Sequence, residues 1–156
     1  MRRTPTTSFH DAAHDTYQAL LATSATLARG VLGPRLIELV NLRISQINGC
    51  AYCVDMHARD LLAQGCDWQW VNSVVTWHEV DFYTEAERAA LGWAEAVTTL
   101  ARHGRDDAYA ALLPHFDERA RAELTFVAAV MNTWNRMAIT LESQVARVPE
   151  LPHPAR

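Results

Sequence analysis

Two cysteines and a histidine lie close together at helical spacing in the first half of the chain. Cys50 and Cys53 are three residues apart, and His57 follows Cys53 by four. Because a helix turns once in 3.6 residues, the three side chains fall on one face of it. Two cysteines at positions i and i+3 can meet disulfide geometry with little distortion, and a histidine one turn on can accept a thiol proton. The pattern predicts a nucleophilic thiol, a second thiol that closes a disulfide, and a base.

The place of this motif at a helix start favours a reactive thiol. Asn48 and Gly49 are typical of a helix end, so we expect a new helix to begin at about Cys50. Unpaired N–H groups and the positive end of the helix dipole stabilise a thiolate there. Glu38 lies on the preceding helix, and an antiparallel return would bring its carboxylate over the cysteine face. We expect Glu38 to orient His57 and to relay protons.

The two thiols are not equivalent, and two effects favour different ones. The helix dipole favours Cys50 by about 0.3–1 kcal/mol. General-base assistance from His57 favours Cys53 by about 10²–10⁴-fold in rate, or roughly 3–5 kcal/mol. Because the second effect is larger, we predict that Cys53 attacks the substrate and that Cys50 then closes the disulfide.

Two other interpretations of the motif remain open. Cys50, Cys53 and His57 could bind zinc, with Cys66 or Glu38 as the fourth ligand, or the cysteines could be small buried packing residues. Ligands crowded on one helix fit a closed tetrahedron poorly, and the chain has no second C-x-x-C and no H-x-x-H pattern. We therefore expect thiol redox chemistry without a bound metal or other cofactor, and we interpret Cys66 as a packing residue.

Length and composition restrict the class of protein. The 156 residues suit one domain spanning the whole chain, and 49% of them are hydrophobic. The net charge is −4, and the 14 basic residues are all arginines without a basic run, so nucleic acid is not expected as a partner. The absence of lysine excludes a Schiff-base lysine within the chain.

Residues 1–18 do not resemble a signal peptide, and residues 124–131 are too short to span a bilayer. We predict a soluble cytoplasmic protein that does not bind membranes.

Apolar residues recur at helical spacing along the whole chain, and no segment alternates as a strand would. The predicted fold class is all-α. The expected helices span residues 9–27, 34–48, 50–64, 68–75, 85–101, 106–113 and 118–141. Residues 1–8 and 148–156 are expected to fray.

Several polar residues mark the ends of these helices. Pro34 suits a first helical position, and Asp67 and Asp117 are suitable N-caps. Thr84 and Glu87 have the spacing of a capping box. In the last helix, Asn132, Asn135 and Arg136 are polar within an apolar sequence, and we expect a buried hydrogen-bond network at a subunit contact.

The site residues also match a known family pattern. A Glu, eleven residues and then C-x-x-C-x-x-x-H is the signature of the AhpD-like alkylhydroperoxidases of the carboxymuconolactone decarboxylase superfamily, and Glu38, Cys50, Cys53 and His57 match it position for position. The segment 132–136 resembles the N-x-W-N-R motif of the last helix in small members. Residues 77–78 and 83–88 resemble the middle region, so the likeness covers about residues 32–141.

The resemblance implies an AhpD-like helical domain that assembles as hexamers or trimers and reduces small-molecule hydroperoxides with electrons from a dithiol reductant. It implies that Cys53 attacks peroxide, that Cys50 resolves the sulfenic acid, and that Glu38 and His57 relay protons. One departure is Tyr52, where the best-studied type has a histidine. The decarboxylase branch lacks the C-x-x-C pair, so its lactone chemistry is a poor match. A redox sensor or interaction protein without catalysis, or a metal-binding structural domain, is the alternative.

Overall fold

The structure is a computed structural model that describes residues 9–100 and 102–147, and these residues form helices joined by loops, without a strand. The predicted all-α class is confirmed. The predicted fraying concerns residues 1–8 and 148–156, which lie outside the described residues. The helices are α1 (Phe9–Ala12), α2 (His14–Ala28), α3 (Pro34–Asn48), α4 (Ala51–Ala63), α5 (Trp68–Asn72), the 3₁₀ helix η1 (Ser73–Glu79), α6 (Glu85–Thr99), α7 (Arg105–Leu112) and α8 (Glu118–Thr140).

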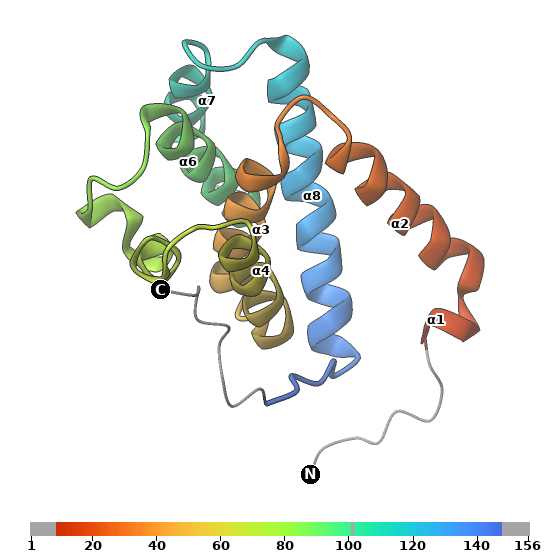
Figure 1. Cartoon of the computed structure of the whole chain (residues 1–156). Coiled ribbons are helices and arrows are strands. Elements are labelled where there is room, and N and C mark those ends of the chain that lie inside the picture. The colour runs from red at the N-terminus through yellow and green to blue at the C-terminus, as the bar shows by residue number, and fades with distance from the viewer. Residues whose placement is uncertain (1–8, 101, 148–156) are drawn as a thin grey trace.

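Helix α3 is central, because it packs against α4, α6, α8 and η1 (Figure 1). Its side chains contribute to two hydrophobic clusters. Val40 and Ile44 belong to a cluster with residues of α6 and α8, while Leu39 and Leu42 belong to a second cluster with residues of α4, α5 and η1. All four are essentially inaccessible to solvent. Truncating a leucine at such a position costs about 2–5 kcal/mol, so both faces of α3 are fixed by packing.

Helix α2 is packed much more lightly. It runs along the side of α8 that faces away from α6 and α7 (Figure 1), and it contributes no fully buried side chain. Tyr17, Leu20, Ser24 and Leu27 are half-buried, and their spacing of three or four residues places them on the face toward the rest of the protein. Trp134 of α8 donates a hydrogen bond from Nε1 to Ser24 Oγ at 3.0 Å. Helix α2 therefore forms an outer wall rather than part of the core.

The predicted helix ends are largely confirmed. Pro34 occupies the first turn of α3, and Asp67 and Asp117 each accept a backbone N–H with the side chain. Thr84 and Glu87 form the complete capping box, in which each side chain accepts the other residue's backbone N–H. Substituting such caps by alanine costs about 0.5–2 kcal/mol.

Two helix predictions were wrong in detail. The expected helix over residues 9–27 is interrupted at Ala13, whose φ of −126° and ψ of 48° are not helical, in a segment with little packing to keep it continuous. The helix expected to end at Val75 instead changes to a 3₁₀ helix after Asn72. Val71, Val74 and Trp77 are buried at intervals of three residues, which matches the three residues per turn of a 3₁₀ helix.

Within residues 9–100 and 102–147, no helix has the length and apolar character needed to cross a bilayer.

Candidate active site

A tight turn between α3 and α4 places the cysteines. Gly49 adopts a left-handed conformation with φ of 70°, which glycine tolerates without strain, and it ends α3. The N–H of Cys50 then donates to Ser45 O at 3.0 Å. Cys50 is the N-cap of α4, which agrees with the predicted helix start at about Cys50, and Cys50 Sγ accepts the N–H of Cys53 at 3.3 Å. The sulfur of Cys50 thus does what an oxygen usually does at an N-cap.

A buried amide network holds this turn against α8. Asn48 Nδ2 donates to both Asn132 Oδ1 and Asn135 Oδ1, each at 2.9 Å. Asn135 Nδ2 donates to Ser45 Oγ at 3.1 Å, and Arg136 donates to Asn132 Oδ1 at 3.1 Å. The network links the end of α3 to α8 within one chain, and its predicted place at a subunit contact stays a prediction. Removing one buried partner from such a network costs about 1–3 kcal/mol, because the other partner is left unsatisfied.

The three cysteines separate into a pair and a single thiol. Cys50 and Cys53 form a disulfide, with their Cα atoms 5.4 Å apart, and both residues are buried. Cys66 is free, half-buried and packed against the hydrophobic cluster of Leu39 and Leu42, as its interpretation as a packing residue predicts. Burial raises the pKa of the Cys66 thiol, and the positive charge of nearby Arg35 offsets only part of this effect. Cys66 is therefore a weak nucleophile.

His57 lies one turn after Cys53 on the buried face of α4 and contacts two other elements. Its Nδ1 is 2.5 Å from Glu38 Oε2 on α3, and its Nε2 is 3.2 Å from Met131 Sδ on α8. An ionised Glu38 can only accept, so Nδ1 carries the proton and Nε2 of the neutral ring retains its lone pair. Glu38 thus contacts the imidazole at Nδ1, and Nε2 faces the thioether of Met131.

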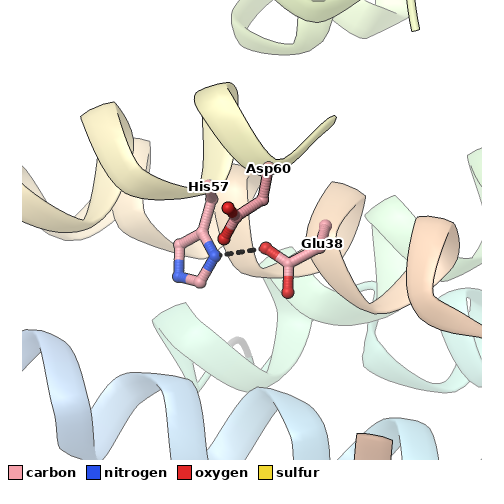
Figure 2. Close-up of side chains that lie close together, drawn as sticks. All are labelled: Glu38, His57 and Asp60. Carbon is pink, nitrogen blue, oxygen red and sulfur yellow. Dashed lines mark hydrogen bonds and ion pairs between the residues drawn. The ribbon is translucent and has the colours of Figure 1, made fainter. Parts of the chain in front are cut away.

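A second acidic group, Asp60, completes this part of the site and was not predicted from the sequence. Its carboxylate points toward the contact between His57 and Glu38 (Figure 2), and one ligand-type atom from each of the three residues lies within 4.8 Å of the others. Burial, and then the negative charge of Glu38, raise the pKa of Asp60, while His57 has the opposite effect. The sequence did contain a signal for Asp60. It follows His57 by three residues, and this spacing places the side chains of His57 and Asp60 on one face of a helix.

The same three residues also have the spacing of a metal-binding group. Glu38 and His57 also belong to the alternative zinc set, but Cys50 and Cys53 of that set are bonded to each other, and Asp60 was not part of it. The short contact between His57 Nδ1 and Glu38 occupies the nitrogen that faces the carboxylates. The arrangement therefore consists of two carboxylates around one imidazole.

A cavity of about 530 Å³ lies against this group and is bounded by α2, α3, α4 and α8. Among the described residues, its lining includes Cys53, His57 and Glu38, but not Cys50. The rest of the wall is mainly apolar, and it contains Met56, Met131 and Met137, which are all the methionines after Met1. Tyr52, which replaces the histidine of the best-studied type, also lines the cavity and is 41% exposed.

The sequence model of the carboxymuconolactone decarboxylase family matches residues 14–96. The chain belongs to this family. The matched segment runs from the start of α2 into α6 and includes Glu38, Cys50, Cys53 and His57.

Two relatives are similar to most of this chain. YdfG of Bacillus subtilis, an uncharacterized protein, is 36% identical over 110 residues, which are 70% of this chain and 75% of YdfG. YnjA of Escherichia coli, also uncharacterized, is 30% identical over 125 residues, which are 78% of this chain and 69% of YnjA.

Solved structures show the AhpD-like helical fold. A protein of unknown function from Agrobacterium tumefaciens, described as a putative antioxidant defence protein AhpD, superposes with a TM-score of 0.87 at 38% identity, covering 93% of this chain and all of that one. An AhpD-core, peroxidase-related protein from Ralstonia eutropha has a TM-score of 0.74 at 24% identity, covering 84% and 70% of the two chains. The debrominase Bmp8 has a TM-score of 0.78 at 24% identity, covering 87% and 74%. The last two show the fold alone.

Proposed function

We propose that this protein is a thiol peroxidase, which reduces hydroperoxides with the Cys50–Cys53 pair and uses Glu38 and His57 as its proton relay. The observation that supports this most is the shared cavity. Cys53, His57 and Glu38 line one space large enough for a small organic molecule, and Cys50 does not line it. A substrate in that space meets the sulfur of Cys53, which stands one turn from the base.

The first chemical step starts from the reduced protein. His57 Nε2 takes the proton of the Cys53 thiol, and the thiolate attacks the terminal oxygen of the hydroperoxide. A sulfur–oxygen bond forms and the oxygen–oxygen bond breaks. The departing alkoxide takes the proton from His57, so the products are an alcohol and a sulfenic acid on Cys53.

The second step closes the disulfide. The Cys50 thiol attacks the Cys53 sulfur, and the hydroxyl of the sulfenic acid leaves with a proton as water. The structure shows Cys50 and Cys53 bonded, which is the state that this step produces. An external dithiol then reduces the disulfide by exchange and becomes a disulfide itself. Per cycle, one hydroperoxide and one dithiol give one alcohol, one water and one disulfide.

The cavity wall favours a particular kind of hydroperoxide. The methionines and the apolar side chains of α2 and α8 dominate the lining. An organic hydroperoxide would bury its alkyl or aryl group against them, which hydrogen peroxide cannot do. We propose an organic hydroperoxide with an apolar group as substrate. We propose further that the protein is a hexamer or a trimer, and that it acts in the cytoplasm with a dithiol partner.

An assay that couples hydroperoxide reduction to NADPH oxidation through a dithiol reductase system tests the proposal. We expect turnover with cumene or tert-butyl hydroperoxide, less with hydrogen peroxide, and none with Cys53→Ser. A wild-type protein that forms the disulfide once but shows no turnover with any reductant would instead support a redox sensor. The matched control is Cys66→Ala, which removes a thiol outside the cavity and should retain full turnover.

A further inference from the structure

We propose that Asp60 is a positioning residue that acts through Glu38 and His57, and that its charge stabilises the imidazolium formed when Cys53 loses its proton. The inference rests on the proposed function, because it concerns the proton that Cys53 must lose to become reactive.

The geometry brings Asp60 close to the hydrogen-bonded pair of His57 and Glu38. His57 Nδ1 contacts Glu38 Oε2, and a carboxylate oxygen of Asp60 lies within 4.8 Å of one ring nitrogen of His57 and one carboxylate oxygen of Glu38 (Figure 2). Exposure to solvent also increases from Cys53 to Asp60. Cys53 is 2% exposed, the side chains of His57 and Glu38 are 6% and 19% exposed, and Asp60 is at the surface. Asp60 is therefore the most exposed of the four groups, and its carboxylate is directed at the contact between His57 and Glu38 (Figure 2).

The surroundings of Asp60 differ from those of an ordinary surface carboxylate. Asp55, on the same helix, forms two hydrogen bonds to the Arg59 side chain, four residues on, at 2.8 and 3.0 Å. Asp60 has no arginine partner in the part of the chain that the structure describes, and its charged neighbours are Glu38 from α3 and His57 from α4. Helix α5, which packs beside α4, contains no charged residue, and α8 contributes the thioether of Met131 at His57.

The charge of Asp60 has a predictable effect on the thiol. Transfer of a proton from Cys53 to His57 gives a thiolate and an imidazolium, and two adjacent carboxylates stabilise the imidazolium. Removing the charge of Asp60 therefore favours the uncharged thiol and imidazole. Because burial and Glu38 raise the pKa of Asp60, this effect should disappear as the pH falls and Asp60 becomes neutral.

The pH dependence of Cys53 alkylation tests this role without any peroxide. The parent carries Cys50→Ser and Cys66→Ala, so that iodoacetamide reports on Cys53 alone. We expect Asp60→Asn to lower the rate at pH 6–7 by about threefold to tenfold, which corresponds to roughly half to one pKa unit. The difference should vanish in strong acid and above the thiol pKa. Asp60→Glu should restore most of the rate, and Asp55→Asn should leave it unchanged.

The result that overturns the inference is equally specific. If Asp60→Asn and Asp55→Asn both give the pH profile of the parent, Asp60 is an ordinary surface residue. A uniform fall in rate at every pH, not restored by Asp60→Glu, would also overturn it, because a purely structural defect has no reason to follow an ionisation. Failure of the wild type to reduce hydroperoxides would overturn the proposed function separately, since the alkylation profiles are measured without turnover.

Discussion

Two partly buried glutamates, Glu38 on α3 and Glu95 on α6, have contrasting surroundings. Glu95 Oε1 accepts hydrogen bonds from Arg43 Nε and Trp77 Nε1, each at 2.7 Å. Glu38 instead contacts His57 and lies beside the second carboxylate of Asp60, at a cavity. Arg43 and Trp77 keep their protons at all relevant pH values, and the exposed His78 reaches only the other oxygen of Glu95, at 3.5 Å. The imidazole at the short contact with Glu38 is buried and can gain or lose a proton. One carboxylate is therefore fixed as part of the framework, and the other is suited to moving protons.

The contrast extends to the acidity of the two sites. Burial alone would raise the pKa of Glu95, but the hydrogen bonds from Trp77 and Arg43 outweigh it and leave the pKa lowered. Glu95 thus stays ionised and ties α6 to both α3 and η1. The pKa of Asp60 is raised, first by burial and then by the negative charge of Glu38. Burial raises the pKa at both positions, and of the two only Glu95 has donors whose hydrogen bonds outweigh that effect.

Of the substitutions around Glu38, His57→Ala should have the largest effect on hydroperoxide turnover. Loss of the base removes general-base assistance, so we expect hydroperoxide turnover to fall by about 10²–10⁴-fold. The thermal midpoint should change much less than the rate, which circular dichroism can establish on the same sample. A variant that keeps more than half of the wild-type rate would remove His57 from the relay.

Matched substitutions of the two glutamates should then separate their roles. We expect Glu38→Gln to lower turnover by about 10-fold, less than the histidine change, because the base remains but is no longer held by a charge. Glu95→Gln should leave turnover within about twofold and destabilise the fold by about 1–3 kcal/mol, because charged hydrogen bonds are weakened. Urea unfolding and the coupled assay on both variants measure the two effects, and the reverse assignment would contradict the comparison.

The smallest effect concerns acid stability. Because the folded-state pKa of Glu95 is lowered, its ionised form stabilises the fold at pH values above the ordinary glutamate pKa of 4.5, and this contribution is lost as the pH falls through the lowered pKa. Wild type should therefore lose its stability advantage over Glu95→Gln between neutral pH and strong acid. Urea midpoints at pH 7 and in acid measure this, and an advantage that grows toward acid would show that the sign is wrong.

Local signals explain why most of the fold could be predicted. The caps at Pro34, Asp67 and Asp117 and the box of Thr84 and Glu87 act over a few residues, so their sequence spacing alone identifies them. The break at Ala13 had no such local signal in the sequence. A continuous helix there would need packing contacts, and α2 has no buried residue.

The site residues that could be predicted lie on α4 or on the preceding helix, α3. Spacing on α4 placed Cys53 and His57 on one face, and an antiparallel return brought Glu38 to His57. Asp60 was missed because a carboxylate on a helix is usually solvated, and only the position of α3 reveals its acidic neighbour. The cavity depends on α2 and α8, which are distant in sequence, so no local pattern could give its walls or show that Cys50 lies outside them.

The central claim is that Cys53 reacts with peroxide and Cys50 resolves the product. Trapping of sulfenic acid with a dimedone-type reagent, followed by peptide mapping, tests it most directly in two reduced variants that both carry Cys66→Ala. With one equivalent of cumene hydroperoxide, Cys50→Ser should accumulate the adduct on Cys53, because the resolving thiol is absent. Cys53→Ser should show little adduct on Cys50, which lies outside the cavity and away from His57. Strong trapping on Cys50 in the second variant, with Cys53 unmodified in the first, would reverse the two roles and contradict the account.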